Sequence, residues 1–207
     1  MTTFGIERIG QRSLLPVRAI DWILAAGLLA EAVLLASLTA TIASTRIRLW
    51  PPPPGSRAAL AWMWDWTVVA CGAGLVLAVV DYGSWVLDSR AWILAGSVAV
   101  ALGAGLTNWA IRTLGRSTSM GLPGTFSARG PYRWTRNPQY LGDILMTVGI
   151  VLVADSWRVA ALATGGVACL LLAPMAEERW LAERYGESYT RYRHSVPRLI
   201  GRTRGPR

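Results

Sequence analysis

Residues 130–143 have the sequence GPYRWTRNPQYLGD and lie between two apolar segments of the chain. The stretch combines two arginines, Arg133 and Arg136, with two prolines and two tyrosines. Pro138 suits the first turn of a helix, where its missing N–H costs no hydrogen bond. The stretch therefore predicts a polar loop that turns into a helix and presents cationic and aromatic side chains at the start of that helix.

Long apolar runs around this stretch decide the fold class. The chain has 207 residues and is 53% hydrophobic, and its first three apolar runs are each long enough to cross roughly 30 Å of hydrocarbon as a helix. A short fourth run and an adequate fifth are separated only by Asp155-Ser156-Trp157, which predicts a helical hairpin. We expect an all-α integral membrane protein with about five transmembrane helices, at 20–44, 66–87, 91–111, 140–154 and 157–175.

The basic residues predict the orientation in the membrane. All 21 are arginine, and with five spans and a cytoplasmic C-terminus sixteen of them face the cytoplasm, as the positive-inside rule requires. The three arginines before residue 20 oppose this orientation, and the polar segment that carries them argues against a signal peptide. Arginines dispersed among spans favour anionic membrane lipids as partners and argue against nucleic acid. An all-arginine basic set suggests a GC-rich bacterial genome, so we expect a bacterial inner membrane.

Two polar segments flank the predicted hairpin, and both are expected on the cytoplasmic side. Residues 112–137 are rich in glycine, serine and threonine, and the tail after residue 175 begins as a helix that Gly186 interrupts. We therefore divide the chain into N-terminal membrane spans at 1–111 and a functional core at 112–207. The loop 45–62 contains four consecutive prolines, which predict a stiff spacer, and Trp50 belongs to a predicted interfacial aromatic belt.

The charges of the two polar segments are complementary. Glu177 and Glu178 follow the fifth span, so together with the arginines they could hold a zwitterion such as an amino acid headgroup, or a cofactor that contains one. The residues alone leave open that the arginines are membrane anchors and that the glutamates are a solvated pair. Cys71 and Cys169 fall in apolar spans, where they are expected to be small buried hydrophobes and not metal ligands.

The order of these motifs resembles the isoprenylcysteine carboxyl methyltransferase family and its phospholipid methyltransferase relatives. In that family an element G-P-Y-R-x-x-R-H-P-x-Y precedes an apolar hairpin, and E-E-x-x-L-x-x-x-[FY]-G-x-x-Y-x-x-Y-x-x-x-V-P-R follows it. The first element resembles GPYRWTRNPQY at 130–140, and the second resembles the segment from Glu177 to Arg198. The resemblance covers about residues 110–200.

This resemblance implies an integral membrane methyltransferase that uses S-adenosyl-L-methionine. It assigns Glu177 to the α-amino group of the cofactor, where a carboxylate suits an ammonium, while Glu178 should matter less. The implied cofactor-binding residues are Thr125, Phe126, Ser127, Tyr132, Asn137, Pro138, Tyr140 and Glu177. From charge and location, Arg133 and Arg136 are candidate catalytic residues that steer an anionic acceptor. The acceptor would be a lipophilic molecule that enters sideways between the spans, or a small thiol.

One position departs from the family pattern and one rival family remains. Asn137 stands where the family most often has histidine, and an asparagine cannot titrate near neutrality. RNPQYLGD also resembles the R-H-P-N-Y-x-G-[DE] element of NADPH-dependent sterol and steroid reductases, although this chain lacks their R-D-E element after the hairpin. A non-catalytic lipid-binding membrane protein is the third alternative.

Three acidic residues lie in or beside the apolar runs, where charge is costly and usually faces the protein interior. We expect Asp143, one turn into the fourth span, to be a further candidate for a functional role. Glu31 is expected to be structural and paired across helices, and Asp81 to face the interior.

Overall fold

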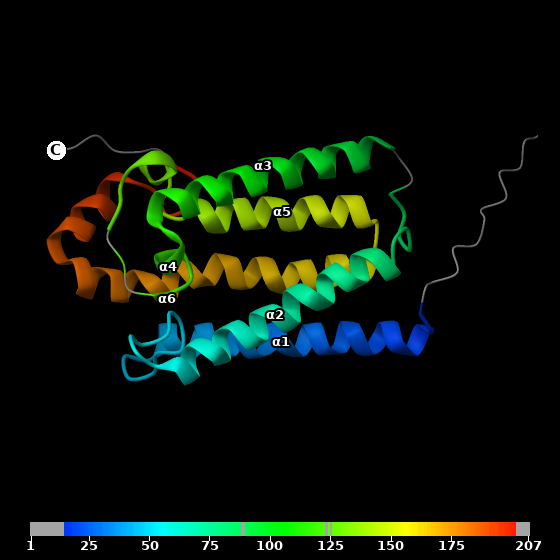
Figure 1. Cartoon of the computed structure of the whole chain (residues 1–207), viewed down its shortest axis with the longest axis horizontal. Helices are drawn as coiled ribbons and strands as arrows, with labels where there is room; N and C mark the ends of the chain where they lie inside the picture. The colour runs from blue at the N-terminus through cyan, green and yellow to red at the C-terminus, as the bar shows by residue number, and fades with distance from the viewer. Residues whose placement is uncertain (1–14, 88–89, 123, 125, 202–207) are drawn as a thin grey trace, which may run out of the picture.

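The structure is a computed structural model that describes residues 15–87, 90–122, 124 and 126–201. Within these residues all regular structure is helical, and long helices run side by side as a bundle (Figure 1). The elements are α1 (Val17–Ala43), α2 (Arg57–Val80), α3 (Arg90–Leu114), α4 (Arg116–Ser119), the 3-10 helix η1 (Gly130–Arg133), α5 (Pro138–Ala154) and α6 (Trp157–Ser195). The predicted all-α class is confirmed.

Each of the five predicted spans corresponds to a helix, but α6 continues twenty residues beyond the predicted end at residue 175. The helices α1, α2, α3 and α6 are long and apolar enough to cross a membrane by length and composition, and α5 is a shorter apolar helix of 17 residues. The predicted hairpin is present, because α5 ends at Ala154 and α6 begins at Trp157. Ser156 caps α6 by accepting a hydrogen bond from the Val159 N–H, which satisfies one of the free donors of the first turn.

The second helix differs from its predicted range of 66–87. It begins at Arg57, because the side chain of Ser56 accepts a hydrogen bond from the Ala59 N–H and so caps the helix. It ends before Asp81, so residues 82–87 are not helical. The run of apolar residues therefore located this span without locating its ends.

Close backbone contacts join α3 to α5. A Cβ atom built on Gly103 would lie 2.5 Å from the Gly142 carbonyl oxygen, and one built on Gly96 would lie 2.7 Å from the Gly149 carbonyl oxygen. Small residues at such positions let two membrane helices approach each other closely. The helix α3 thus packs on the predicted functional core although the division places it in the N-terminal part, and the boundary after residue 111 stays a prediction.

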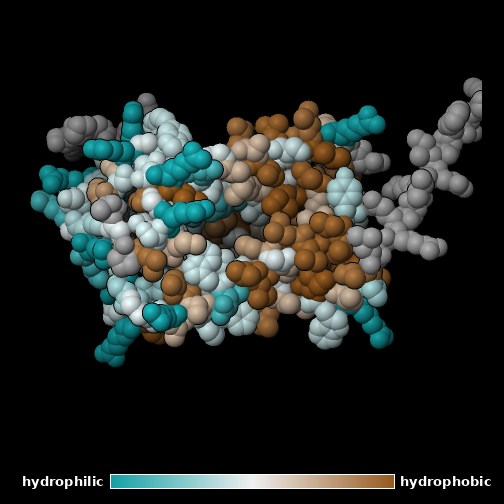
Figure 2. Space-filling model, in the orientation of Figure 1, coloured by the Kyte–Doolittle hydropathy of each residue, from teal (hydrophilic) through white to brown (hydrophobic). Residues whose placement is uncertain are grey.

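The two ends of the bundle differ in character. At one end lie α4, η1, the start of α5 and the last part of α6, and we call this the polar end. Figure 2 shows hydrophilic residues gathered there and hydrophobic residues over the rest of the bundle on this face. At the opposite end, Arg158 pairs with Asp81 at 2.8 Å and Asp21 at 2.9 Å. Asp81 is buried, so the expectation that it faces the interior is confirmed.

Candidate functional site

The two predicted polar segments meet at the polar end. The Asn137 side-chain amide donates to the Arg198 carbonyl oxygen at 2.9 Å, and the Tyr192 hydroxyl donates to the Tyr132 carbonyl oxygen at 2.7 Å. The first bond joins the residue before α5 to the chain after α6, 61 residues away, and the second joins η1 to the last part of α6, 60 residues away. The structure therefore places the loop before the hairpin and the tail after it on the same side of the bundle, as the sequence predicted.

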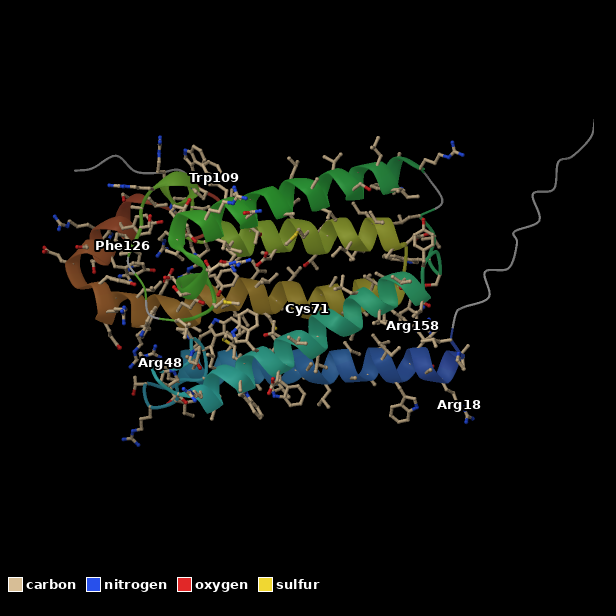
Figure 3. All side chains as sticks on the ribbon, in the orientation of Figure 1. Arg18, Arg48, Cys71, Trp109, Phe126 and Arg158 are labelled. Carbon is tan, nitrogen blue, oxygen red and sulfur yellow. The ribbon has the colours of Figure 1, made fainter. Side chains whose placement is uncertain are left out.

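Gly186 bends α6 so that its last part returns toward this loop. The glycine has φ 55° and ψ −130°, a conformation that a residue with a side chain rarely adopts. Three tyrosines of α6 surround the ring of Phe126, which Figure 3 labels at the polar end; Tyr185 lies just before the bend, and the other two lie after it. The ring centroids lie 5.6 Å from Tyr185, 6.3 Å from Tyr189 and 5.1 Å from Tyr192. The predicted break at Gly186 is confirmed.

Between these segments lies a cavity of about 130 Å³, which we call the polar cavity. Its walls come from the loop before α5, the start of α5, and both sides of the bend in α6. The lining residues that bear on the argument are Phe126, Ser127, Tyr132, Arg136, Asn137, Tyr140, Glu177 and Tyr192. The cavity is thus lined by aromatic rings with one acidic and one basic side chain among them.

Glu177 is the acidic group of this cavity and lies two residues beyond Met175, where the apolar part of α6 ends. Its Oε1 atom accepts hydrogen bonds from the Tyr140 hydroxyl and from Trp50 Nε1, the latter at 3.0 Å. Burial raises the pKa of the Glu177 carboxyl, and the two hydrogen bonds lower it in part. Both donors are neutral, and no described cation lies within salt-bridge distance of Glu177. The carboxylate therefore complements a positively charged group.

Glu178 has a different role. It accepts two hydrogen bonds from Arg198, at 2.7 and 2.8 Å, and lies 2.9 Å from Nη1 of Arg136. Burial raises the pKa of its carboxyl, but the bonds from Arg198 and the nearby arginine charges outweigh this and lower it. Glu178 holds the chain after α6 against the loop before α5, and the prediction that the two glutamates differ in role agrees with this geometry.

The two candidate catalytic arginines occupy different environments. Arg136 lines the polar cavity with a side chain only 9% exposed. It lies at ion-pair distance from Glu178, yet its Nε and Nη1 atoms have no partner with hydrogen-bond geometry among the described residues. Arg133 is exposed, outside the cavity wall, and its guanidinium lies 5.6 Å from the ring of Trp134. The position of Arg133 therefore does not support the predicted catalytic role.

Most of the expected cofactor-binding residues converge on the polar cavity. Phe126, Ser127, Tyr132, Asn137, Tyr140 and Glu177 all line it. Pro138 does not: its side chain is fully buried in the first turn of α5, where it supports the helix behind the wall. Thr125 lies outside the residues that the structure describes.

The structure adds site residues that the sequence analysis did not propose. Trp50, expected in an interfacial belt, donates a hydrogen bond to Glu177 instead. Pro51, which follows it, lines the polar cavity. The neighbouring Arg48 lies 5.1 Å from the ring of Trp180 (Figure 3). The proline-containing loop thus covers the site, and no local sequence signal identifies a contact between residues 127 positions apart.

A second, larger cavity of about 510 Å³ extends from the site into the bundle between α1, α2, α5 and α6, and we call it the apolar cavity. Figure 2 shows the surface hollowed between the hydrophilic and hydrophobic regions. The residues that line both cavities are Pro51, Ser119, Gly121, Gln139, Tyr140 and Glu177. A group bound beside Glu177 in one cavity would therefore face a molecule in the other.

The apolar cavity also contains the polar residues that were singled out in the spans. Asp143 lines it and accepts a hydrogen bond from the Thr107 hydroxyl at 2.8 Å. Glu31 lines it deeper in the bundle. Cys71, on α2 in Figure 3, lines it too but is exposed, so the expectation that it is buried is wrong.

Comparisons with known proteins find matches to two groups. A family model described as phospholipid methyltransferase matches residues 91–188. The chain is also 30% identical over 122 residues to a protein named steroid 5-alpha-reductase DET2 from Solanum lycopersicum, an alignment that covers 57% of this chain and 47% of the relative. The chain thus spans about half the length of this curated relative. No solved structure matches the chain.

Proposed function

Because residues 91–188 match the phospholipid methyltransferase family, we propose that the chain is an integral membrane methyltransferase. It would move a methyl group from S-adenosyl-L-methionine to a lipophilic or small-thiol acceptor at the membrane interface. The observation that supports this most is the position of Glu177 on the wall shared by the polar and apolar cavities, where its buried carboxylate has no cationic partner among the residues that the structure describes.

The residues of the polar cavity fit the amino acid end of this cofactor. Glu177 would hold the α-ammonium group by a charged hydrogen bond. Arg136, whose Nε lacks a partner, offers a donor to the α-carboxylate. The faces of Tyr132 and Tyr192, both lining residues, suit a cation such as the sulfonium. When bound, the cofactor would supply an electrophilic methyl group on that sulfonium: an acceptor lone pair would bond to the methyl carbon as the carbon–sulfur bond breaks, and the sulfur would leave as a neutral thioether.

The chain would contribute positioning and exclusion of water. The apolar cavity would hold the acceptor so that its reacting atom lies at the shared wall near Tyr140 and Glu177, and orientation of this kind supplies a large part of catalysis. Asn137 donates its amide to Arg198 and cannot take up a proton at neutral pH, so it would not serve as a base. Acceptors that arrive as anions, such as a carboxylate or a thiolate, are therefore favoured.

The match to a steroid reductase supports a second candidate, a reductase that uses NADPH. NADPH carries several phosphate charges, which proteins bind with arginine, lysine or helix N-termini. Among the described lining residues of the polar cavity, Arg136 is the cation, and it already lies beside Glu178. An acidic Glu177 in the same wall opposes a polyanionic ligand, so the charges of the site favour S-adenosylmethionine.

Ligand binding and product analysis together test this proposal. The purified full chain in lipid nanodiscs would be titrated separately with S-adenosylmethionine and with NADPH. We expect saturable binding of the first and none of the second; the reverse would establish the reductase, and binding of neither would support a lipid-binding protein. Incubation with methyl-labelled S-adenosylmethionine and extracted membrane lipids should then label an acceptor. Labelling of the protein by an impermeant reagent, compared between intact and permeabilised cells, would test the proposed cytoplasmic position of the site and the C-terminus.

A further inference from the structure

Glu31 is an acidic residue in the middle of the membrane helix α1 that no described cation accompanies. Its exposed fraction is 6%, and its Oε2 atom has no hydrogen-bond partner among the described residues. The side chain lies against α6, where a Cβ atom built on Gly165 would fall 2.2 Å from Oε2. The expected pairing with a side chain across helices is therefore absent. A buried oxygen that lacks a partner is unfavourable, because it has lost its hydrogen bonds to water.

Glu31 also lines the apolar cavity, where a Cβ atom built on the lining residue Gly166 would fall 3.3 Å from its other carboxyl oxygen, Oε1. Glu31, Gly166 and Leu170 line that cavity together, and the same cavity reaches Tyr140 and Glu177 at the other end. Gly166 precedes Glu177 by eleven residues on α6, which corresponds to about 17 Å of helix. A molecule that fills the cavity would thus meet the carboxyl of Glu31 far from the proposed reaction point, along walls that are mostly apolar but include the polar residues Asp143 and Thr67.

Resting on the proposed function, we propose that Glu31 binds a hydroxyl group on the apolar body of the methyl acceptor. An ionised carboxyl only accepts hydrogen bonds, whereas a protonated one also donates. A hydroxyl both donates and accepts, so it suits Glu31 in either state. The acceptor is then an elongated lipid with its methylated group at the shared wall and a hydroxyl about 17 Å further into the bundle.

A matched set of neutral lipid probes tests this proposal without any turnover. Methyl 12-hydroxystearate and methyl stearate differ only in a hydroxyl partway along the chain, and methyl 2-hydroxystearate carries that hydroxyl beside the ester. Binding to the detergent-solubilised full chain would be measured by native mass spectrometry. We expect methyl 12-hydroxystearate to bind about tenfold more tightly than the other two, the effect of one hydrogen bond to a buried carboxyl. Equal affinities for all three probes in the unchanged protein would overturn the proposal.

Two variants assign the preference to Glu31. Glu31→Met removes the hydrogen-bonding oxygens at similar length and should abolish the preference, whereas Glu31→Gln can still donate and accept and should retain most of it. Thr67→Val is the matched control, because Thr67 lines the same cavity but its hydroxyl already donates to the Met63 carbonyl oxygen at 2.7 Å. A preference unchanged in Glu31→Met would refute the assignment. The affinity ratio within one variant does not depend on the amount of folded protein.

The outcome is separable from that of the proposed function. If the unchanged protein binds S-adenosylmethionine but shows no preference for the 12-hydroxy probe, only the role of Glu31 is refuted. A hydroxyl preference without S-adenosylmethionine binding would refute only the methyltransferase.

Discussion

Replacing Glu177 by glutamine tests the site most directly. Its carboxylate accepts hydrogen bonds from Trp50 and Tyr140 and has no described cationic partner, so an ammonium ligand would provide its first opposite charge. Glutamine keeps the size and one acceptor oxygen but removes the charge. Loss of one hydrogen bond between charged groups costs about 1.5–3 kcal/mol, which corresponds to roughly ten- to a hundredfold weaker binding of S-adenosylmethionine.

The measurement is calorimetric titration in nanodiscs, with Glu178→Gln as the matched control. Glu178 faces Arg136 and Arg198, so its variant should bind S-adenosylmethionine within a few-fold of the unchanged protein once folded. Burial raises the pKa of Glu177, so its protonation begins at a higher pH than that of an ordinary glutamate. Affinity should therefore fall as the pH is lowered in the unchanged protein, and fall less in Glu177→Gln. Equal, small losses in both variants would refute the reasoning.

Three further predictions concern contacts that hold the tail and the helices of the bundle together. Glu178→Gln should lower the stability of the docked tail by about 1–3 kcal/mol, measured as faster proteolysis after α6. The pKa of Glu178 is lowered, so its contribution to stability is present above the ordinary glutamate pKa and is lost as the pH falls below it. Equal proteolysis rates in the variant and the unchanged protein would contradict this prediction. Gly103→Ala should destabilise the protein by about 1–3 kcal/mol through overpacking. Gly105→Ala is the control: nothing lies within 4 Å of the new Cβ atom, so this change should be neutral or stabilising. If thermal unfolding in detergent ranks the two variants the other way, the close contact at Gly103 is excluded. Arg158→Met should cost about 3–5 kcal/mol by leaving Asp81 buried without its cation, and adding Asp81→Asn should recover part of the loss of melting temperature; no recovery would argue against the pair.

The sequence predicted the hairpin and the convergence of its flanking segments well, because run lengths and turn residues are local signals. Asp155 and Ser156 interrupt the apolar run where α5 meets α6, and the structure turns there. The start of α2 was missed because a cap at Ser56, and not hydropathy, sets it. Composition therefore did not predict where the helices that form the site begin and end.

The side-chain roles within the site were predictable only in part. The family resemblance assigned Glu177 and Tyr140 to one site, and both line the polar cavity. It did not indicate which of the two nearby arginines points inward. The 3-10 geometry of η1 leaves Arg133 exposed, whereas Arg136, beyond it, is drawn in beside Glu178. Trp50 was missed because its contact with Glu177 depends on how a distant loop folds over the bundle.

The shared wall of the two cavities also bears on the order of events in a reaction cycle. The polar cavity lies at one end of the molecule and the apolar cavity within the bundle, so each proposed reactant has a route of its own. Spent cofactor can then be exchanged while the lipid stays in place. Exchange of the cofactor and release of the methylated lipid would then be independent steps, and the two reactants could bind in either order.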